Sequence, residues 1–258
     1  MTIITPSFNQ GKYIGETIRS VLSQNHDDVE HLVVDGGSRD GTLDILRGYP
    51  HLRWTSEPDS GQSEAINKGF RRATGEVLAW LNSDDYYEPN VLGDVAASFQ
   101  DHPECMVLYG DITFVNAGGE RLGAFTGGSI DRENLIRNPD IVRQPSFFWR
   151  RQVLDEIGFL DERLHLVMDF DFFLRLAMRY PLHYLNRNLS YFRVHGESKS
   201  LSQRRRQLLE IRSVYRKHGI GMNTAIARFY VRQLVQWSGI RKFAGRVVRV
   251  FTPTAPGV

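Results

Sequence analysis

Cysteine is almost absent from this sequence: Cys105 is the single one among 258 residues, so no disulfide can form within the chain. Because disulfides belong to oxidising compartments, we expect a reducing, cytoplasmic location. No apolar run approaches the ~20 residues that cross a bilayer. The start from Met1 to Pro6 lacks the basic segment and long apolar stretch of a signal peptide. Internal repeats and low-complexity tracts are missing too, which leaves the composition of an ordinary globular protein.

The net charge of +2 hides an asymmetry along the chain. From Gln203 to the end there are twelve Lys or Arg residues and one acidic residue, Glu210, which gives this segment +11. The rest carries twenty basic and twenty-nine acidic residues, or −9. An acidic body can hold a metal ion, and a basic tail can meet an anionic partner.

Apolar runs and helical periodicity alternate along the first eighty residues. Short apolar runs predict strands at 3–5, 31–34, 52–55 and 77–81, and helical spacing predicts helices at 13–24, 42–46 and 62–73. This β, α, β, α, β, α, β order predicts an α/β fold with a mostly parallel central sheet flanked by helices. In such sheets, ligands bind beyond the carboxyl ends of the strands.

The second half is less regular. We expect strands at 106–109 and 112–115, a hairpin turn at Gly118-Gly119, a helix within 161–180 and a last strand within 183–194. The basic tail has three stretches with helical spacing, at 204–218, 224–237 and 240–251. The last two are amphipathic, and such helices either lie in an anionic membrane surface or pack on the protein.

Polar residues cluster directly after three of the predicted strands. The clusters are Thr5–Asn9, Asp35–Thr42 and Asn82–Asp85. Because carboxyl ends of parallel strands meet at one edge, we expect a single site built from three loops.

The adjacent carboxylates of Asp84 and Asp85 are costly to hold together without a cation. Oxygen ligands suit Mg²⁺ or Mn²⁺, although Asn, Ser and Asp also favour turns and helix starts. Asp35 stands before two glycines, where a carboxylate can accept a hydrogen bond from a nucleobase N–H, and Asp40 is expected only to cap the turn. Gln62, at a helix start, can face the nucleotide or a solvated surface.

Two further segments offer catalytic groups. Asp169 and Asp171 are two residues apart on a predicted helix, so they face different directions. We assign Asp171 to an ion pair with Arg175, at i+4, and Asp169 to general base catalysis, because a carboxyl among apolar groups has a raised pKa. His195 follows the last predicted strand, where it is either a metal ligand or a structural hydrogen-bonding residue.

Taken together, these segments resemble the family 2 glycosyltransferases, which have the GT-A nucleotide-diphospho-sugar transferase fold. The resemblance covers roughly residues 2–200. It rests on Thr5–Gln10, the turn at Asp35, the helix start at 61–69, Asn82–Asp85, Gln144–Phe148, the segment around Asp169 and His195.

The resemblance implies a role for each matching residue. Donor binding falls to Thr5, Pro6 and Phe8 around the base, to Asp35 on its N–H, to Gln62 along the helix start, and to Asn82 and Ser83 near the ribose. Asp84 and His195 would bind Mn²⁺ or Mg²⁺, with Asp84 the principal ligand because Asn82 replaces a common Asp. Asp169 would be the base of an inverting displacement, with Gln144 on the acceptor side.

We therefore expect a catalytic domain at 1–202, with a donor half at 1–104 and an acceptor half at 105–202, and a helical tail at 203–258. The acceptor would be a saccharide or a lipid-linked saccharide of bacterial cell-surface glycan assembly. The tail would bind the inner face of an anionic membrane. Nucleic acid is not an expected partner. Two other hypotheses remain: a non-catalytic nucleotide-sugar-binding scaffold, and a sugar nucleotidyltransferase, whose Gly-rich basic loop is missing at Ser7–Lys12.

Overall fold

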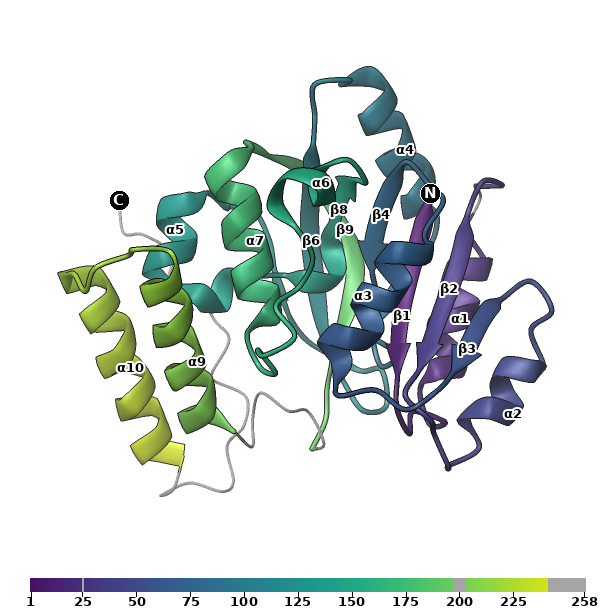
Figure 1. Ribbon diagram of the computed structural model, residues 1–258, viewed down its shortest axis with the longest axis horizontal. Coiled ribbons are helices and arrows are strands. Elements are labelled where there is room, and N and C mark those ends of the chain that lie inside the picture. Colours follow the sequence, from purple (N-terminus) through teal and green to yellow (C-terminus); the bar gives the residue numbers. More distant parts are fainter. Residues whose placement is uncertain (25, 197–202, 241–258) are drawn as a thin grey trace.

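The computed structural model describes residues 1–24, 26–196 and 203–240 (Figure 1). Strands and helices alternate in the first part: β1 (Thr2–Ser7), α1 (Ile14–Leu22), β2 (Glu30–Asp35), α2 (Thr42–Arg47), β3 (Arg53–Ser56), α3 (Gln62–Arg72) and β4 (Val77–Trp80). This is the predicted order, and each predicted strand overlaps an observed one.

Longer strands and more helices make up the second part: β5 (Tyr86–Tyr87), α4 (Val91–Asp101), β6 (Val107–Asn116), β7 (Arg121–Phe125), α5 (Arg132–Arg137), η1 (Pro139–Ile141), η2 (Gln144–Ser146), β8 (Phe147–Arg150), α6 (Val153–Ile157), α7 (Met168–Arg179), β9 (Leu182–Val194), α9 (Arg204–Lys217) and α10 (Thr224–Ile240). The helix expected within 161–180 and the strand expected within 183–194 correspond to α7 and β9.

Within the described residues, nine strands form one sheet in the order β3-β2-β1-β4-β8-β6-β9-β5, with β7 paired to β6. Strands β3, β2, β1 and β4 are parallel, as the alternating pattern predicts. Beyond β4 the sheet is mixed, because β8 runs antiparallel to both β4 and β6 whereas β9 is parallel to β6. The predicted α/β fold is confirmed, with parallel pairing concentrated in its first half.

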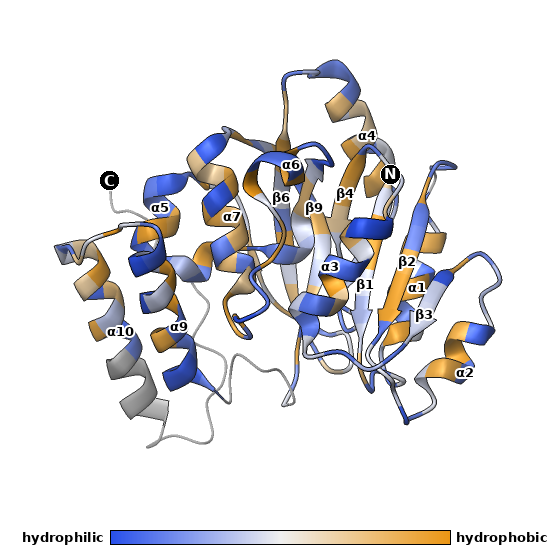
Figure 2. Ribbon diagram, viewed as in Figure 1, coloured by the Kyte–Doolittle hydropathy of each residue, from blue (hydrophilic) through white to orange (hydrophobic). Residues whose placement is uncertain are grey.

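Alternate residues of the strands face two different layers of helices. One face, with Ile4, Trp80 and Trp149, packs against residues of α3 and α7. The other face, with Ile3 and Val33, packs against α1, α2 and α4. Since successive strand residues point to opposite faces, a sheet covered on both sides needs apolar residues on both faces of its strands. Figure 2 shows such colouring in β4 and in the lower part of β2.

Strand β6 joins the two short strands that were predicted at 106–109 and 112–115. The strand continues through Gly110 and Asp111, which lie between the two predicted strands, with register shifts against β9. Gly110 makes this possible, because a Cβ at this position would lie 2.6 Å from Leu189 Cδ1. The predicted hairpin turn follows at 117–120, where Gly119 has a φ of +86°.

The tail helices α9 and α10 lie beside α5 and α7 (Figure 1). Their apolar faces, including Tyr215, Ile226 and Phe229, are buried in the same core as α7. Of the two expectations for the amphipathic tail, packing on the protein holds for this part. The third tail helix, expected at 240–251, falls outside the described residues from 241 on. No helix in the described part of the chain has both the length and the apolar composition needed to span a bilayer.

Candidate active site

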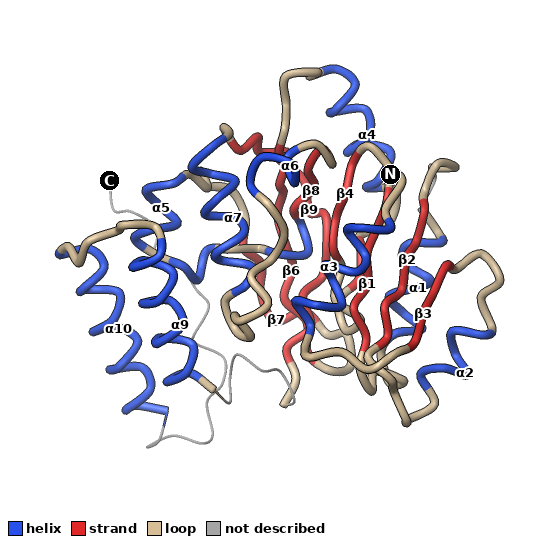
Figure 3. The backbone as a smooth tube through the Cα atoms, in the orientation of Figure 1, coloured by secondary structure: helices blue, strands red, loops and turns tan. Residues whose placement is uncertain are grey.

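The carboxyl ends of β1, β2 and β4 lie together at the lower edge of the sheet in Figure 3. Ser7, at the end of β1, is in register with Asp35, at the end of β2. The N–H of Leu81 donates to the carbonyl of Ile4 over 2.9 Å, which places the chain leaving β4 beside the same strand. The three polar segments therefore meet at one edge, as the sequence predicts.

The loops that follow β1 and β2 are hydrogen-bonded to each other. The N–H of Asn9 donates to Ser38 Oγ over 2.7 Å, and Asn9 Oδ1 accepts from the N–H of Arg39 over 2.9 Å. Asp40 Oδ2 accepts from the N–H of Gly11 over 2.9 Å. Asp40 thus closes the turn, which is the role predicted for it. The hydrogen bonds join the two loops side by side at this edge of the sheet.

The carboxylate of Asp35 is fully buried at the end of β2. Its oxygens accept from the N–H groups of Gly37 and Ser38, over 3.0 and 2.9 Å, and from the hydroxyls of Ser38 and Ser56. Four donors fix the orientation of this carboxylate, so it is a preorganised acceptor at the strand end.

Thr5, Pro6 and Phe8, the residues expected around the nucleobase, differ in exposure. Thr5 and Pro6 are buried, and Thr5 Oγ1 is hydrogen-bonded to His31 Nε2 over 2.9 Å. Burial lowers the pKa of His31 to about 3, so this imidazole is neutral. Phe8 is 60% exposed and is the one of the three whose side chain is available at the rim.

Asn82 is the centre of a side-chain network that joins three segments of the chain. Its Oδ1 accepts from Gln62 Nε2 over 2.8 Å and from Trp80 Nε1 over 2.9 Å. Its Nδ2 donates to Gln144 Oε1 over 2.9 Å, and Gln144 also donates to the carbonyl of Trp80. Gln62, Asn82 and Gln144 were each singled out separately in the sequence, and the structure brings them together.

Asp84 and His195 are in direct contact although 111 residues separate them. Asp84 Oδ2 lies 2.9 Å from His195 Nε2, and the side chains are 25% and 6% exposed, respectively. The imidazole also packs against the ring of Tyr13, with centroids 4.9 Å apart. Ser83, the neighbour of Asp84, is buried, and its carbonyl accepts from Thr17 Oγ1 over 2.9 Å. Helix α1 therefore supports the segment that carries Asp84.

Asp84 and His195 are the residues that would hold the implied metal ion, with one carboxylate and one imidazole. Across residues 1–24, 26–196 and 203–240, no group of three or more His, Cys, Asp or Glu side chains gathers as a metal site. Such a two-ligand set fits Mg²⁺ or Mn²⁺ that completes its coordination with water and substrate phosphates, rather than a closed structural metal site.

Asp85 is a structural residue rather than a ligand. It is 1% exposed, and its Oδ1 accepts from the N–H of Arg193 over 2.9 Å. Burial and the neighbouring Asp84 hold the pKa of Asp85 well above its usual value. Its side chain fastens β9 to the segment of Asp84 and so brings His195 into position.

Arg193 is a supporting residue of the site that sequence reasoning missed. Its guanidinium is 2% exposed and donates to the carbonyls of Asp84 and Ala117, over 2.9 and 3.1 Å, while it pairs with Glu16. It thereby ties α1, the β6–β7 turn and β9 to the Asp84 backbone. A buried strand that carries an arginine two residues before a candidate ligand is the sequence signal that could have found it.

Asp169 is the second residue of α7, which begins at the same edge of the sheet (Figure 1). The segment before it packs on the start of α3, because Ser63 Oγ donates to the carbonyl of Leu164 over 2.9 Å. Burial raises the pKa of the Asp169 carboxyl to about 6. A carboxylate with this pKa is ionised at neutral pH and is a competent proton acceptor.

Asp171 has the structural role predicted for it. It is fully buried, and its oxygens lie 3.0 Å from Arg175 Nε, 2.9 Å from His218 Nε2 and 3.2 Å from Lys217 Nζ. Burial alone would raise the pKa of Asp171, but Arg175 and the tail residues hold it below its usual value. The carboxylate anchors the end of α9 on α7.

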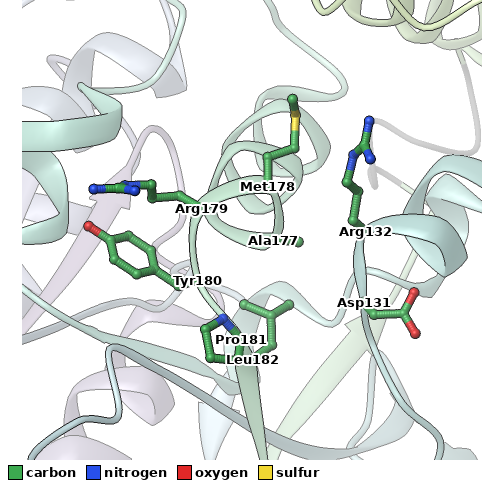
Figure 4. Close-up of a pocket in the computed structure, with 8 residues that line it drawn as sticks. All are labelled: Asp131, Arg132, Ala177, Met178, Arg179, Tyr180, Pro181 and Leu182. Atoms are coloured by element: carbon green, nitrogen blue, oxygen red, sulfur yellow. The ribbon is translucent and has the colours of Figure 1, made fainter.

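A shallow pocket of about 310 Å³ lies at the opposite end of α7 (Figure 4). It is lined by Asp131, Arg132 and the segment 177–182. Because α7 has twelve residues, this pocket is roughly 15 Å from Asp169 along the helix axis. It is separate from the site at the strand ends.

Known proteins that match the chain are glycosyltransferases. The chain is 32% identical over 180 residues to a PGL/p-HBAD biosynthesis glycosyltransferase of Mycobacterium tuberculosis, covering 67% of this chain and 68% of that protein. It is 27% identical over 219 residues to an uncharacterised glycosyltransferase of Nostoc sp., covering 78% and 67% of the two chains.

Solved structures share the fold at low sequence identity. TarS from S. aureus in complex with UDP-GlcNAc superposes with a TM-score of 0.69 at 20% identity, covering 95% of this chain and 76% of that one. The mannosyltransferase PcManGT from Pyrobaculum calidifontis, in complex with GDP-Man and Mn²⁺, gives 0.64 at 18%, with the same coverage. The family model of glycosyl transferase family 2 matches residues 2–158, more than half of the sequence. The chain is therefore a glycosyltransferase that belongs to family 2.

Proposed function

We propose that this enzyme transfers a sugar from a nucleotide diphosphate sugar to an acceptor hydroxyl, with inversion at the anomeric carbon. The observation that carries the proposal is the contact between Asp84 and His195 at the edge where Asp35 and Asn82 also lie. A carboxylate, an imidazole and a fixed hydrogen-bond acceptor at the carboxyl ends of parallel strands suit a nucleotide diphosphate.

The donor lies along the three strand-end loops in this proposal. Asp35 accepts a hydrogen bond from the base N–H, and Phe8 covers the base from the exposed rim. Gln62, Asn82 and Ser83 border the ribose, and the network around Asn82 supports a fixed geometry there. The related folds carry UDP-GlcNAc in TarS and GDP-Man in PcManGT, which supports a nucleotide sugar as the donor class.

A divalent cation, Mn²⁺ or Mg²⁺, fits the pair of Asp84 and His195. When bound, it supplies positive charge that stabilises the departing diphosphate. Arg193 and Asp85 hold the two ligands in place through the backbone of residues 84 and 193. The Mn²⁺ in the PcManGT complex supports this choice of metal.

Asp169 takes the acceptor proton in the proposed displacement. The acceptor oxygen forms the new bond to the anomeric carbon as the bond to the diphosphate breaks, and its proton passes to the Asp169 carboxylate. A single displacement of this kind inverts the anomeric configuration. The pKa of about 6 supports the assignment, because the group is ionised at neutral pH yet basic enough to accept a proton.

The acceptor is a saccharide or a lipid-linked saccharide, bound on the side of Gln144 and α7. We place the reaction in bacterial cell-surface glycan assembly, at the cytoplasmic face of the membrane, and the named biosynthetic relative in Mycobacterium tuberculosis supports that setting. The exposed face of α9 and α10 supports contact with an anionic surface. Its exposed basic residues include Arg205, Arg212, Arg216, Arg228 and Arg232.

A thermal-shift screen tests the donor and the metal together. UDP-, GDP-, dTDP- and CMP-sugars are compared, each with and without Mn²⁺. A donor at one hundred times its dissociation constant stabilises the protein by about 2.7 kcal/mol, which is roughly 5–10 °C for a chain of this size. We expect one nucleotide class to give such a shift with Mn²⁺ and a much smaller one without it.

The matched control is the corresponding nucleoside monophosphate with Mn²⁺, which lacks the diphosphate and should stabilise far less. Equal shifts with and without metal would contradict the metal site. If no nucleotide sugar gave a shift, the donor site itself would be wrong.

Vesicle cosedimentation tests the membrane contact. We expect binding to phosphatidylglycerol vesicles at low salt and none to phosphatidylcholine, because each basic residue near an anionic surface contributes about 1 kcal/mol. Reversing two exposed charges, as in Arg212→Glu with Arg216→Glu, should weaken binding at least tenfold. Reversing Arg47 on α2, which is 61% exposed, is the control and should have little effect. Equal binding to phosphatidylglycerol and phosphatidylcholine vesicles would refute the membrane contact. An equal loss of binding in the tail variant and the Arg47 variant would refute it too.

A further inference from the structure

The segment 158–167 leads from α6 into α7 and sets where Asp169 points. On one side it is held by α3, in the donor half. The N–H of Leu160 donates to Asn67 Oδ1 over 3.0 Å, and Asn67 Nδ2 donates back to the Leu160 carbonyl over 3.0 Å. Ser63 Oγ donates to the Leu164 carbonyl over 2.9 Å. The segment is therefore fastened to the helix that carries Gln62.

On its other side the same segment is held by the tail helix α9. Glu210 Oε2 accepts from two successive N–H groups, those of His165 and Leu166, over 3.0 and 2.8 Å. The side chain of Glu210 is 12% exposed, and its Oε1 accepts from Arg206 Nε over 3.1 Å. The single acidic residue of the basic tail is therefore turned inward, onto the backbone just before Asp169.

No side chain caps the start of α7 at its N-cap residue, Val167. Within the first turn, Asp169 Oδ1 accepts from the N–H of Phe170 over 2.8 Å. The two N–H groups before the N-cap, those of His165 and Leu166, are bound by Glu210 from α9. The backbone that enters the first turn is therefore held by α9.

The two residues that follow Asp169 on α7 also contact α9 and its C-cap residue, His218. The ring of Phe170 meets Tyr215 edge to face, with centroids 5.7 Å apart, and Asp171 lies 2.9 Å from His218 Nε2. These contacts secure the body of α7, whereas Glu210 secures the backbone that enters it.

We propose that Glu210 is a positioning residue for Asp169, so that the tail helix α9 is part of the catalytic apparatus. The proposal rests on the proposed role of Asp169 as the base. Glu210 fixes the backbone of residues 165 and 166, the first turn of α7 starts from that fixed point, and the Asp169 carboxylate is thereby aimed at the acceptor hydroxyl and kept from water. A shift of about 1 Å in such a group can lower the rate by about 10²-fold.

Three variants test this proposal. Glu210→Ala removes the acceptor for both N–H groups, whereas Glu210→Gln keeps an amide oxygen that can accept from both but loses the charge. Leu209→Ala, at an exposed position of the same helix, is the matched control. If Glu210→Ala does not fold, Glu210→Asp replaces it, because its carboxylate is one methylene short of the two N–H groups.

The first readout needs neither donor nor metal. Carbon-13 NMR of the Asp169 carboxyl should show its pKa fall from about 6 toward 4 in Glu210→Ala, because a loosened first turn admits water. Hydrogen exchange of residues 164–170 should quicken at least tenfold in the same variant. Glu210→Gln and Leu209→Ala should match the wild type in both measurements.

The second readout is turnover, measured as nucleotide release from UDP-GlcNAc or GDP-mannose with acceptor present. We expect Glu210→Ala to lower kcat 10- to 100-fold with donor Kd within twofold, and Glu210→Gln to recover most of the loss. An unchanged Asp169 titration in Glu210→Ala, or a Glu210→Gln variant as impaired as the alanine one, overturns the proposal. Full turnover by Asp169→Asn instead would overturn the role of Asp169, which separates the two failures.

Discussion

Asp169→Asn is expected to lower turnover by ~10²–10⁴-fold, the range typical for loss of a general base. Nucleotide-sugar binding should stay within about twofold of the wild type. The substitution changes one oxygen to an amide nitrogen, so the shape of the side chain is kept. What is lost is the ability to take the acceptor proton at the moment of bond formation. Because the donor does not need this carboxylate, kcat should fall and donor affinity should not.

The pH dependence of kcat distinguishes the wild type from Asp169→Asn. With a pKa of about 6 for Asp169, wild-type kcat should rise about tenfold per pH unit below pH 6 and level off above it. The residual activity of Asp169→Asn should not show that limb. A variant with normal turnover, or one that keeps the same rising limb, would exclude Asp169 as the base.

Stability provides the control for this variant. The pKa of Asp169 is raised in the folded protein, so its contribution to stability is present below about pH 4 and is lost as the pH rises through 6. A shift from 3.8 to about 6 corresponds to a free-energy cost on the order of 3 kcal/mol above pH 6. Asp169→Asn should therefore be at least as stable as the wild type at pH 8. Asp171→Asn, two residues on, should be less stable, because it leaves Arg175 and Lys217 with a neutral partner.

The second large effect is expected at the metal pair. Asp84→Ala should abolish the metal-dependent part of donor binding, because it removes the single carboxylate of that pair. Substitution of residues that merely support a metal ligand costs 10–100-fold in affinity, and loss of the ligand itself should cost at least that much. With affinity one hundredfold weaker, the 2.7 kcal/mol of donor stabilisation falls to about 0.4 kcal/mol at the same donor concentration.

Calorimetric titration of Mn²⁺ in the presence of the donor measures this loss directly. Asp44→Ala, a substitution of an exposed carboxylate on α2, is the matched control and should titrate like the wild type. Thermal unfolding without ligands should be little changed in Asp84→Ala, since its carboxylate is a quarter exposed and its partner is His195. Metal-dependent donor binding that survives in Asp84→Ala would mean that the metal is held elsewhere.

The sequence alone determined the parallel half of the sheet and the edge where its loops meet. Short apolar runs that alternate with helical periodicity predict parallel pairing among strands β1 to β4, because helical crossovers join parallel strands and cover both faces of the sheet. The polar residues that end these strands are then forced to one edge. Asp35, Asn82 and Asp84 could therefore be chosen as site residues before any fold was seen.

Which of two neighbouring carboxylates faces the site was decided by the tertiary structure. Asp84 and Asp85 are adjacent in sequence and equal in chemistry, yet Asp84 meets His195 while Asp85 is buried on the backbone of β9. Periodicity shows which residues share a face, but it does not show which distant strand pairs with which. The pairing of β9 with β5 and β6 follows from burial of the whole sheet.

The tertiary structure also decided how the tail docks on the rest of the protein. Its basic composition predicts a separate surface element. Its helical periodicity correctly predicts the helices α9 and α10. The direction of its apolar faces, toward α5 and α7, and the turning inward of Glu210 depend on contacts across 44 or more residues. Local sequence specifies such helices because their hydrogen bonds are local, whereas their docking is specified by side chains that only the folded core brings within reach.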